Sequence, residues 1–234
     1  MRIGIFGGSF NPVHNGHIHL AKTAAAEFSL DRIFFVPSRI SPHRSMTEYA
    51  AAEDRLEMLR LACANEPLFE VCDYELRSDR VSYTIYTIEY FRSRFPDDEL
   101  FLLVGSDMLL SFDKWFCYEK ILAQASLCVI SRHEGDSAEL KKKSQELKKL
   151  GKIYVSESLP LVISSTEIRK KIAKNKDFTC YLDKNVVQYI RLKGLYSLRG
   201  DKKMLYDPET KKKYLKENLS AKRYTHSLNV AEEC

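Results

Sequence analysis

The chain has 234 residues, 44% of them hydrophobic and 29% charged, which is typical of a soluble globular protein of one or two domains. It contains no apolar run long enough to span a bilayer and no signal peptide before Arg2, so we expect neither a membrane protein nor a secreted one. The formal net charge of +5 does not by itself indicate a nucleic-acid partner, although residues 201–223 hold eight Lys or Arg against four Asp or Glu.

Short apolar segments alternate with amphipathic ones along the chain. The segments expected as strands, mostly apolar on both faces, are Arg2–Gly7, Arg32–Pro37, Glu70–Leu76, Leu100–Gly105, Ser126–Ser131, Lys152–Ser156 and a further run, Leu161–Ile163, that leads into a helix. Between them apolar residues recur at helical spacing, as at Leu56, Leu59 and Cys63. This alternation predicts an α/β fold with a doubly wound parallel sheet, in which ligands bind beyond the carboxyl ends of the strands.

The segment after the first expected strand carries the strongest functional signal. It reads Gly7-Gly8-Ser9-Phe10-Asn11-Pro12-Val13-His14-Asn15-Gly16-His17 and leads into a segment with helical spacing. The free N–H groups and the dipole of such a helix start attract anions, and two imidazoles add donors for phosphate oxygens. A single His here would more often be a cap or a surface residue. The glycines are not spaced as G-x-G-x-x-G, which disfavours a dinucleotide-binding oxidoreductase.

The segments after the second and fourth expected strands should lie at the same edge of the sheet. Ser41-Pro42-His43-Arg44 belongs to a proline-stiffened loop with basic side chains, which is either an ordinary polar loop or a phosphate contact. Gly105 and Asp107 follow the fourth strand, where Asp107 could also simply cap a helix. Trp115 comes next. A lone Trp usually packs in a core, but an indole can also stack on a positively charged pyridinium ring.

Two hydroxyl-rich segments stand where helices are expected to begin. Ser82-Tyr83-Thr84 offers hydroxyls and free N–H groups that suit an anionic carboxylate. Ser164-Ser165-Thr166-Glu167 precedes Arg169 and can be read as a helix-capping arrangement. The same residues also offer hydroxyl, N–H and guanidinium donors to a triphosphate.

Residues 7–17, together with the run I-S-S-T-E-I-R at residues 163–169, resemble the motifs of the bacterial nicotinate mononucleotide adenylyltransferases, which belong to the nucleotidyltransferases with a (His/Thr)-x-Gly-His motif. The resemblance covers residues 1 to about 198. It implies a Rossmann-like nucleotidyltransferase fold and transfer of the adenylyl group of ATP to nicotinate mononucleotide, giving nicotinate adenine dinucleotide (deamido-NAD) and pyrophosphate in NAD biosynthesis. Two residues depart from the family pattern: Arg44 replaces a Lys, and Tyr86 stands where an acidic residue is common.

The resemblance also implies roles for the site residues. His14 and His17 are the expected catalytic residues, with His17 at the α-phosphoryl oxygens and His14 positioning the phosphates. The residues expected to bind ATP are Gly7, Gly8, Ser9, Phe10, Arg44, Gly105, Asp107, Ser165, Thr166 and Arg169. Those expected to bind nicotinate mononucleotide are Ser82, Tyr83, Thr84 and Trp115. Mg²⁺ is expected to arrive on the ATP phosphates, and we expect no metal site in the chain itself.

The end of the chain differs from the rest. We expect residues 1–198 to form the adenylyltransferase domain and residues 199–234 to form a linker and a helical extension. This extension resembles the truncated first helix of an HD-type metallohydrolase domain, with His226 as an orphaned first ligand; a basic terminal helix with an incidental His is the alternative. A fused or adjacent hydrolase domain and a homo-oligomer are both left open. The six cysteines form no C-x-x-C pair, so a reducing cytoplasm is expected.

Three rival functions are weighed against this one. An adenylyltransferase that acts on nicotinamide mononucleotide, or on both the acid and the amide, is the nearest alternative. A phosphopantetheine adenylyltransferase would give no reason for Trp115 or for residues 82–84. A non-catalytic nucleic-acid-binding module would bind RNA with a steep salt dependence and release no pyrophosphate. The expected partners are therefore ATP and nicotinate mononucleotide, with neither nucleic acid nor a membrane among them.

Overall fold

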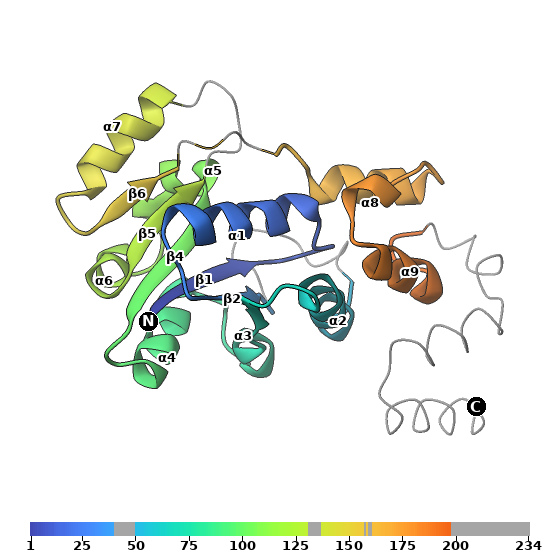
Figure 1. Ribbon diagram of the computed structural model, residues 1–234, viewed down its shortest axis with the longest axis horizontal. Helices are drawn as coiled ribbons and strands as arrows, with labels where there is room; N and C mark the ends of the chain where they lie inside the picture. The colour runs from blue at the N-terminus through green and yellow to red at the C-terminus, as the bar shows by residue number, and fades with distance from the viewer. Residues whose placement is uncertain (40–49, 131–136, 157, 159–160, 198–234) are drawn as a thin grey trace.

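The computed structural model describes residues 1–39, 50–130, 137–156, 158 and 161–197, which are coloured in Figure 1. The predictions made for Arg44, for His226 and for the extension from residue 199 onward therefore lie outside the described residues. Across the described ranges, every helix is too short or too polar to cross a membrane.

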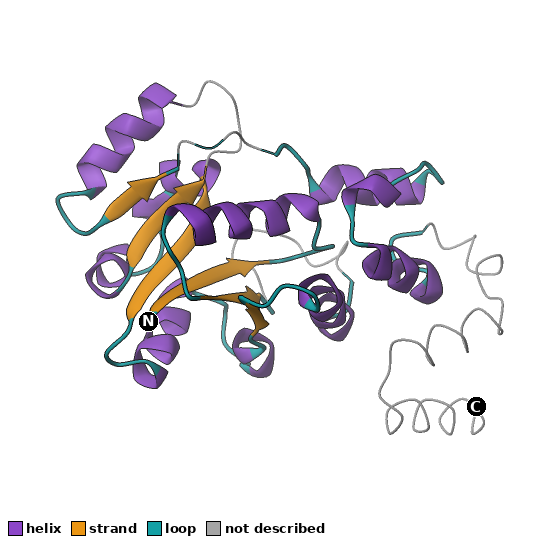
Figure 2. Ribbon diagram, in the orientation of Figure 1, coloured by secondary structure: helices purple, strands orange, loops and turns teal. Residues whose placement is uncertain are grey.

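A six-stranded parallel sheet lies at the centre of the described residues, with strand order β3-β2-β1-β4-β5-β6 (Figure 2). Its strands are β1 (Arg2–Gly8), β2 (Arg32–Pro37), β3 (Phe69–Val71), β4 (Glu99–Gly105), β5 (Ser126–Ile130) and β6 (Ile153–Val155). The helices are α1 (Asn15–Glu27), α2 (Ala52–Cys63), α3 (Tyr74–Arg77), α4 (Thr84–Arg94), α5 (Ser106–Leu110), α6 (Tyr118–Gln124), α7 (Ser137–Leu147), α8 (Ser165–Ala173) and α9 (Lys184–Lys193), with short 3₁₀ turns η2 (Phe112–Lys114) and η3 (Thr179–Tyr181). The predicted doubly wound α/β fold is confirmed.

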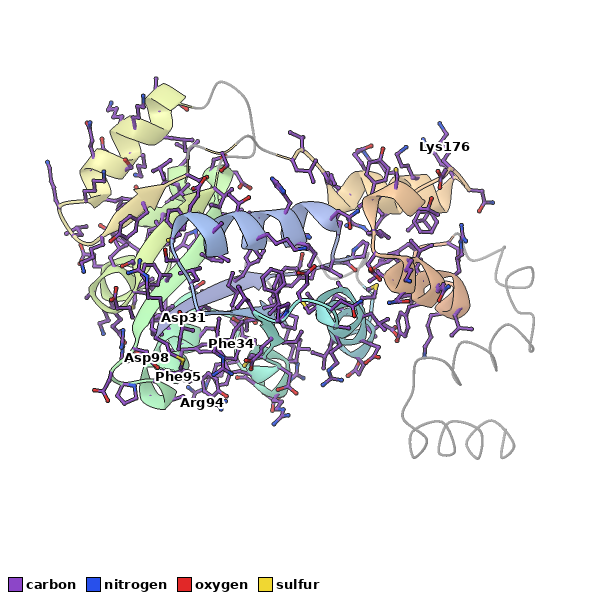
Figure 3. The ribbon with its side chains drawn as sticks, viewed as in Figure 1. Asp31, Phe34, Arg94, Phe95, Asp98 and Lys176 are labelled. Atoms are coloured by element: carbon purple, nitrogen blue, oxygen red, sulfur yellow. The ribbon has the colours of Figure 1, made fainter. Side chains whose placement is uncertain are left out.

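Helices cover both faces of the sheet, and successive strand residues point to opposite faces. In β2, Phe35 packs in the layer formed with α1, α2, α8 and α9, whereas Phe34 packs with α4, α6 and α7. Figure 3 shows Phe34 beside Phe95, which follows α4, and their ring centroids are 5.9 Å apart. Because both faces are buried, the strands need apolar side chains at every position, which is why they read as continuous hydrophobic runs.

Polar contacts hold the amino-terminal edge of the sheet. Asp31 accepts a hydrogen bond from the backbone N–H of Arg2 at 2.7 Å, and Asp98 pairs with the terminal ammonium of Met1. Both carboxylates are labelled at this edge in Figure 3. The loops that follow the carboxyl ends of the strands lie at the opposite edge of the sheet.

The prediction of a strand over Glu70–Leu76 is wrong over most of that range. β3 ends at Val71, and residues 74–77 form the single helical turn α3. An ion pair between Asp73 and Arg77, 2.8 Å apart and four residues apart in sequence, stabilises this turn. The turn also brings Glu75 inward, where it is only 8% exposed.

The prediction of a strand over Leu161–Ile163 is also wrong. These residues form no strand, and Leu161 and Val162 are 47% and 66% exposed. They line a cavity and lead into α8. These residues are therefore apolar because they line the cavity, and not because they form a buried strand.

Candidate active site

A cavity of about 740 Å³ opens at the carboxyl ends of β1 and β4. This volume suits a small-molecule site, and its place is where doubly wound sheets bind ligands. The sequence-predicted residues that line it are Gly7, Gly8, Ser9, His14, His17, Ser82, Tyr83, Thr84, Gly105, Asp107, Trp115, Ser165 and Thr166. The fold thus gathers segments from residue 7 to residue 166 around one space.

The two histidines lie against each other at the start of α1. Their ring centroids are 3.7 Å apart with an interplanar angle of 30°. The backbone N–H of His14 donates to Nδ1 of His17 at 3.2 Å. When Nδ1 of a neutral imidazole accepts a hydrogen bond, the proton must sit on Nε2. His17 is therefore held with Nε2–H as its donor.

Gly16 allows this close pairing. A Cβ at residue 16 would lie 3.1 Å from Nδ1 of His14 and 3.3 Å from Cβ of Ile163. Both distances are tighter than ordinary van der Waals contact. The missing side chain is thus what makes room for the His14 ring beside the segment that leads into α8.

Distant parts of the chain hold the loop between β1 and His14. Oδ1 of Asn11 accepts hydrogen bonds from the hydroxyl of Tyr196 at 2.8 Å and from the backbone N–H of Ala50 at 3.0 Å. The carbonyl of Pro12 accepts a hydrogen bond from Oγ of Ser165 at 3.0 Å. Ala50, 39 positions from Asn11, and Ser165 and Tyr196, 153 and 185 positions from their partners, therefore hold the loop that leads to His14.

Three predicted ATP contacts do not line the cavity or cannot be placed. Phe10 is buried in the core, where its ring meets Phe6 edge-on at 5.4 Å. Arg169 lies beside the cavity loop, and its Nη1 donates to the carbonyl of Asn11 at 2.9 Å. Arg44 lies outside the described residues. His14, His17 and Arg169 nevertheless share the same side of the molecule, as the predicted mechanism requires.

Trp115 and the start of α4 also line the cavity. Trp115 is half-buried and packs on Phe112, with ring centroids 5.0 Å apart. α4 begins at Thr84, two residues later than the expected start at Ser82, with Tyr83 as its N-cap. Oγ of Ser82 accepts a hydrogen bond from the backbone N–H of Arg39 at 3.2 Å. This wall offers an aromatic face next to the free N–H groups of a helix start.

The chain is similar to known proteins over most of its length. Residues 5–171 match the model of the cytidylyltransferase-like family. The chain is 40% identical to a probable nicotinate-nucleotide adenylyltransferase of Clostridium novyi over 76% of this chain and 90% of that protein. It is 35% identical to one of Caldicellulosiruptor saccharolyticus over 84% of this chain and 99% of that protein.

The chain belongs to the cytidylyltransferase-like family, and the two relatives described above are probable nicotinate-nucleotide adenylyltransferases. The family resemblance seen in the sequence is thereby confirmed. A solved structure of Plasmodium falciparum nicotinic acid mononucleotide adenylyltransferase complexed with NaAD superimposes with a TM-score of 0.69 at 23% identity. It covers 83% of this chain and 97% of that chain, and supports the fold.

Nucleotidyltransferases typically use a divalent metal ion. In the part of the chain that the structure describes, no group of three or more His, Cys, Asp or Glu could hold one. Asp107 supplies a carboxylate at the cavity wall. These residues fit an ion that arrives on phosphate groups and keeps most of its waters.

Glu75 is a buried carboxyl that also lines the cavity of this family member. Its Oε1 accepts a hydrogen bond from Oγ1 of Thr87 at 2.5 Å. This hydrogen bond and the neighbouring Ser82 favour the charged form. Burial outweighs them and raises the pKa of the Glu75 carboxyl above its ordinary value of 4.5.

We expect Glu75→Gln to gain stability relative to the wild type as the pH rises. A group whose pKa is raised by folding stabilises the fold fully below its unfolded pKa, near 4.5, and this contribution is lost as the pH rises through the folded pKa. Gln does not titrate. The unfolding free energy of the variant minus that of the wild type should therefore increase from about pH 4.5 upward and become constant above the folded pKa of Glu75. Urea denaturation at a series of pH values measures it, and a difference independent of pH contradicts the expectation.

Sequence reasoning assigned no role to several residues that shape the site. Arg55 is 2% exposed, and its Nη1 donates to the carbonyl of Ser9 at 2.8 Å. The sequence could have indicated that Arg55 is buried, because Arg55 precedes Leu59 by four residues and so shares the buried face of a helix. Asn11 and Tyr196 carried no such signal, since their hydrogen bond joins segments at opposite ends of the described chain.

Proposed function

We propose that this chain transfers the adenylyl group of ATP to nicotinate mononucleotide and releases nicotinate adenine dinucleotide and pyrophosphate. The observation that carries the proposal is the pair of closely packed imidazoles at the start of α1, in the same cavity as Trp115 and the start of α4. One end of the cavity suits transferring phosphates, and the other suits a charged pyridine ring with an anionic substituent. A cytoplasmic location goes with the proposal.

The reaction needs little covalent help from the protein. The phosphate of nicotinate mononucleotide is largely dianionic near neutral pH, because its second pKa is about 6. One of its oxygens attacks the α-phosphorus of ATP, and the bond to the bridging oxygen breaks as pyrophosphate leaves with that electron pair. The protein then has to hold the attacking and leaving oxygens in line and stabilise charge on the transferring group. No covalent enzyme intermediate is required.

Separate residues of the cavity bind the phosphates and stabilise the charge on the transferring group. His17 directs its Nε2–H to the α-phosphoryl oxygens, and His14 positions the phosphates. Thr166, at the first turn of α8, offers a hydroxyl donor to the β- and γ-phosphates, and Ser165, whose hydroxyl donates to Pro12, offers its backbone N–H. Arg169 has five N–H donors, so it can hold the carbonyl of Asn11 and a phosphate at the same time. Arg44 is proposed as a further phosphate contact.

Mg²⁺ is the metal we propose, carried on the phosphates of ATP. When bound, it supplies charge neutralisation for the β- and γ-phosphates as pyrophosphate departs. Asp107 is the described cavity carboxylate that could accept hydrogen bonds from its waters or from the nucleotide.

Pyrophosphate release from ATP with nicotinate mononucleotide as acceptor tests the proposal directly. Turnover with this acceptor is expected, and its absence at millimolar acceptor would contradict the proposal. The same assay with nicotinamide mononucleotide tests the alternative function, because dual use would give comparable kcat/KM for acid and amide. Steeply salt-dependent RNA binding without pyrophosphate release would instead support the nucleic-acid-binding alternative.

Replacement of Trp115 should weaken acceptor binding selectively. Stacking of an indole on a pyridinium ring contributes about 1–2 kcal/mol, so Trp115→Ala should raise KM for nicotinate mononucleotide roughly tenfold while KM for ATP stays unchanged. Trp115→Phe keeps an aromatic face and should cause a smaller rise. Because Trp115 also packs on Phe112, the melting temperature of each variant is measured alongside. An equal rise in both KM values would contradict the stacking role.

A further inference from the structure

Glu75 is a buried carboxyl that the proposed reaction does not use. It comes from α3, is 8% exposed, and reaches the cavity beside the start of α4. Burial of an ionisable group disfavours folding unless hydrogen bonds compensate, and a neutral side chain of similar size would avoid that cost. A carboxyl in this place therefore calls for a reason other than stability.

The hydrogen bond of Glu75 connects two segments of the cavity wall. Thr87, one turn inside α4, donates to Oε1 at 2.5 Å and is itself only 2% exposed. Ser82, just before α4, also favours the charged form of this carboxyl. Oγ of Ser82 accepts a hydrogen bond from the backbone N–H of Arg39, which follows β2, at 3.2 Å. Glu75 thus ties α3 to the first turn of α4, beside the contact between Ser82 and the loop after β2.

This arrangement changes which donors face the ligand. A hydroxyl carries one proton, and the proton of Thr87 is directed to Glu75. This hydroxyl then orients the helix start, while backbone N–H groups of the first turn of α4 remain the natural donors to an anion. An amide oxygen can also accept the Thr87 proton, but that hydrogen bond lacks the charge assistance of a carboxylate and is weaker.

We propose that Glu75 is a positioning residue for acceptor recognition: by accepting the hydroxyl of Thr87 it fixes the start of α4, which receives the ring carboxylate of the acceptor. This inference rests on the proposed function, since it concerns the acceptor of that reaction. It predicts that loss of the carboxyl affects the acceptor and leaves ATP and the chemical step unaffected.

The test is the separation of KM from kcat in the full chain. Glu75→Gln should raise KM for nicotinate mononucleotide about five- to tenfold, with kcat and KM for ATP within twofold of the wild type. Thr87→Val, which removes one donor and keeps the side-chain shape, should act in the same direction. Thr87→Ser restores the hydroxyl and should recover most of the acceptor affinity. Glu99→Gln, at the exposed start of β4 on the other edge of the sheet, is the matched control and should behave as wild type.

The outcomes separate the two proposals. If the wild type turns over nicotinate mononucleotide and Glu75→Gln and Thr87→Val keep its KM, the role of Glu75 is overturned and the proposed function stands. If Glu75→Gln lowers KM for the acid, the carboxyl acts by repulsion, and the positioning role is also overturned. If the wild type itself releases no pyrophosphate with this acceptor, both proposals fail. Calorimetric titration with nicotinate mononucleotide alone should give the same ranking of variants as KM.

Discussion

Replacement of His17 by Ala is expected to lower kcat by about 10²-fold or more, because the variant loses a donor aimed at charge that develops in the transition state. The structure gives the physical basis. The backbone N–H of His14 occupies Nδ1 of His17, so a neutral ring presents Nε2–H in one fixed direction. A donor that is already oriented needs no reorganisation when the phosphoryl oxygens gain charge.

The stability of the His17→Ala variant should change little. Ala favours a helix, and His17 is only half-buried in α1. Single-turnover measurements with saturating ATP would separate the chemical step from product release. Lys22→Ala, on an exposed position of the same helix, is the control for effects on α1. Near-normal turnover in His17→Ala would refute the assigned role.

The sequence predicted most of the sheet because the burial of both faces leaves a simple pattern. β2 illustrates this, since Phe34 and Phe35 are both buried but pack against helices on opposite faces. The apolar pattern led to wrong strand predictions where a run of apolar residues does not form a strand. Leu161 and Val162 line the cavity, and Tyr74–Arg77 forms a helical turn that brings Glu75 to it. Short apolar runs alone cannot distinguish these cases.

The candidate site could be assembled from the sequence because parallel strands deliver their following loops to one edge. That rule placed residues 7–17 and Trp115 together, and both segments contribute to the cavity. Residues 165 and 166 line the same cavity although the strand expected before them does not form. It could not give the second set of contacts, in which Tyr196 and Ala50 hold Asn11. Those hydrogen bonds depend on how α2 and the segment after α9 pack, which no local spacing records.

Replacement of Gly16 by Ala should separate activity from stability. Inside a helix, Ala is favoured over Gly by up to about 1 kcal/mol, so α1 alone would gain stability. The new methyl group, however, would lie 3.1 Å from Nδ1 of His14 and 3.3 Å from Cβ of Ile163. The His14 ring must shift away, and it carries with it the contact to His17 at 3.7 Å between centroids.

Contacts this tight are relieved by a shift of a few tenths of an ångström. Because misplacement of catalytic groups by about 1 Å can cost 10²-fold in rate, we expect Gly16→Ala to lower kcat several-fold, up to about 10-fold. The melting temperature should stay within a few degrees of the wild type. Ala26→Gly, on an exposed position of the same helix, is the converse control: it should reduce stability by about 1 kcal/mol and leave kcat unchanged. Wild-type kcat in Gly16→Ala would mean that the pairing of the two imidazoles does not limit the reaction. Loss of both activity and stability in Gly16→Ala would mean that the methyl group disrupts the packing of α1 instead.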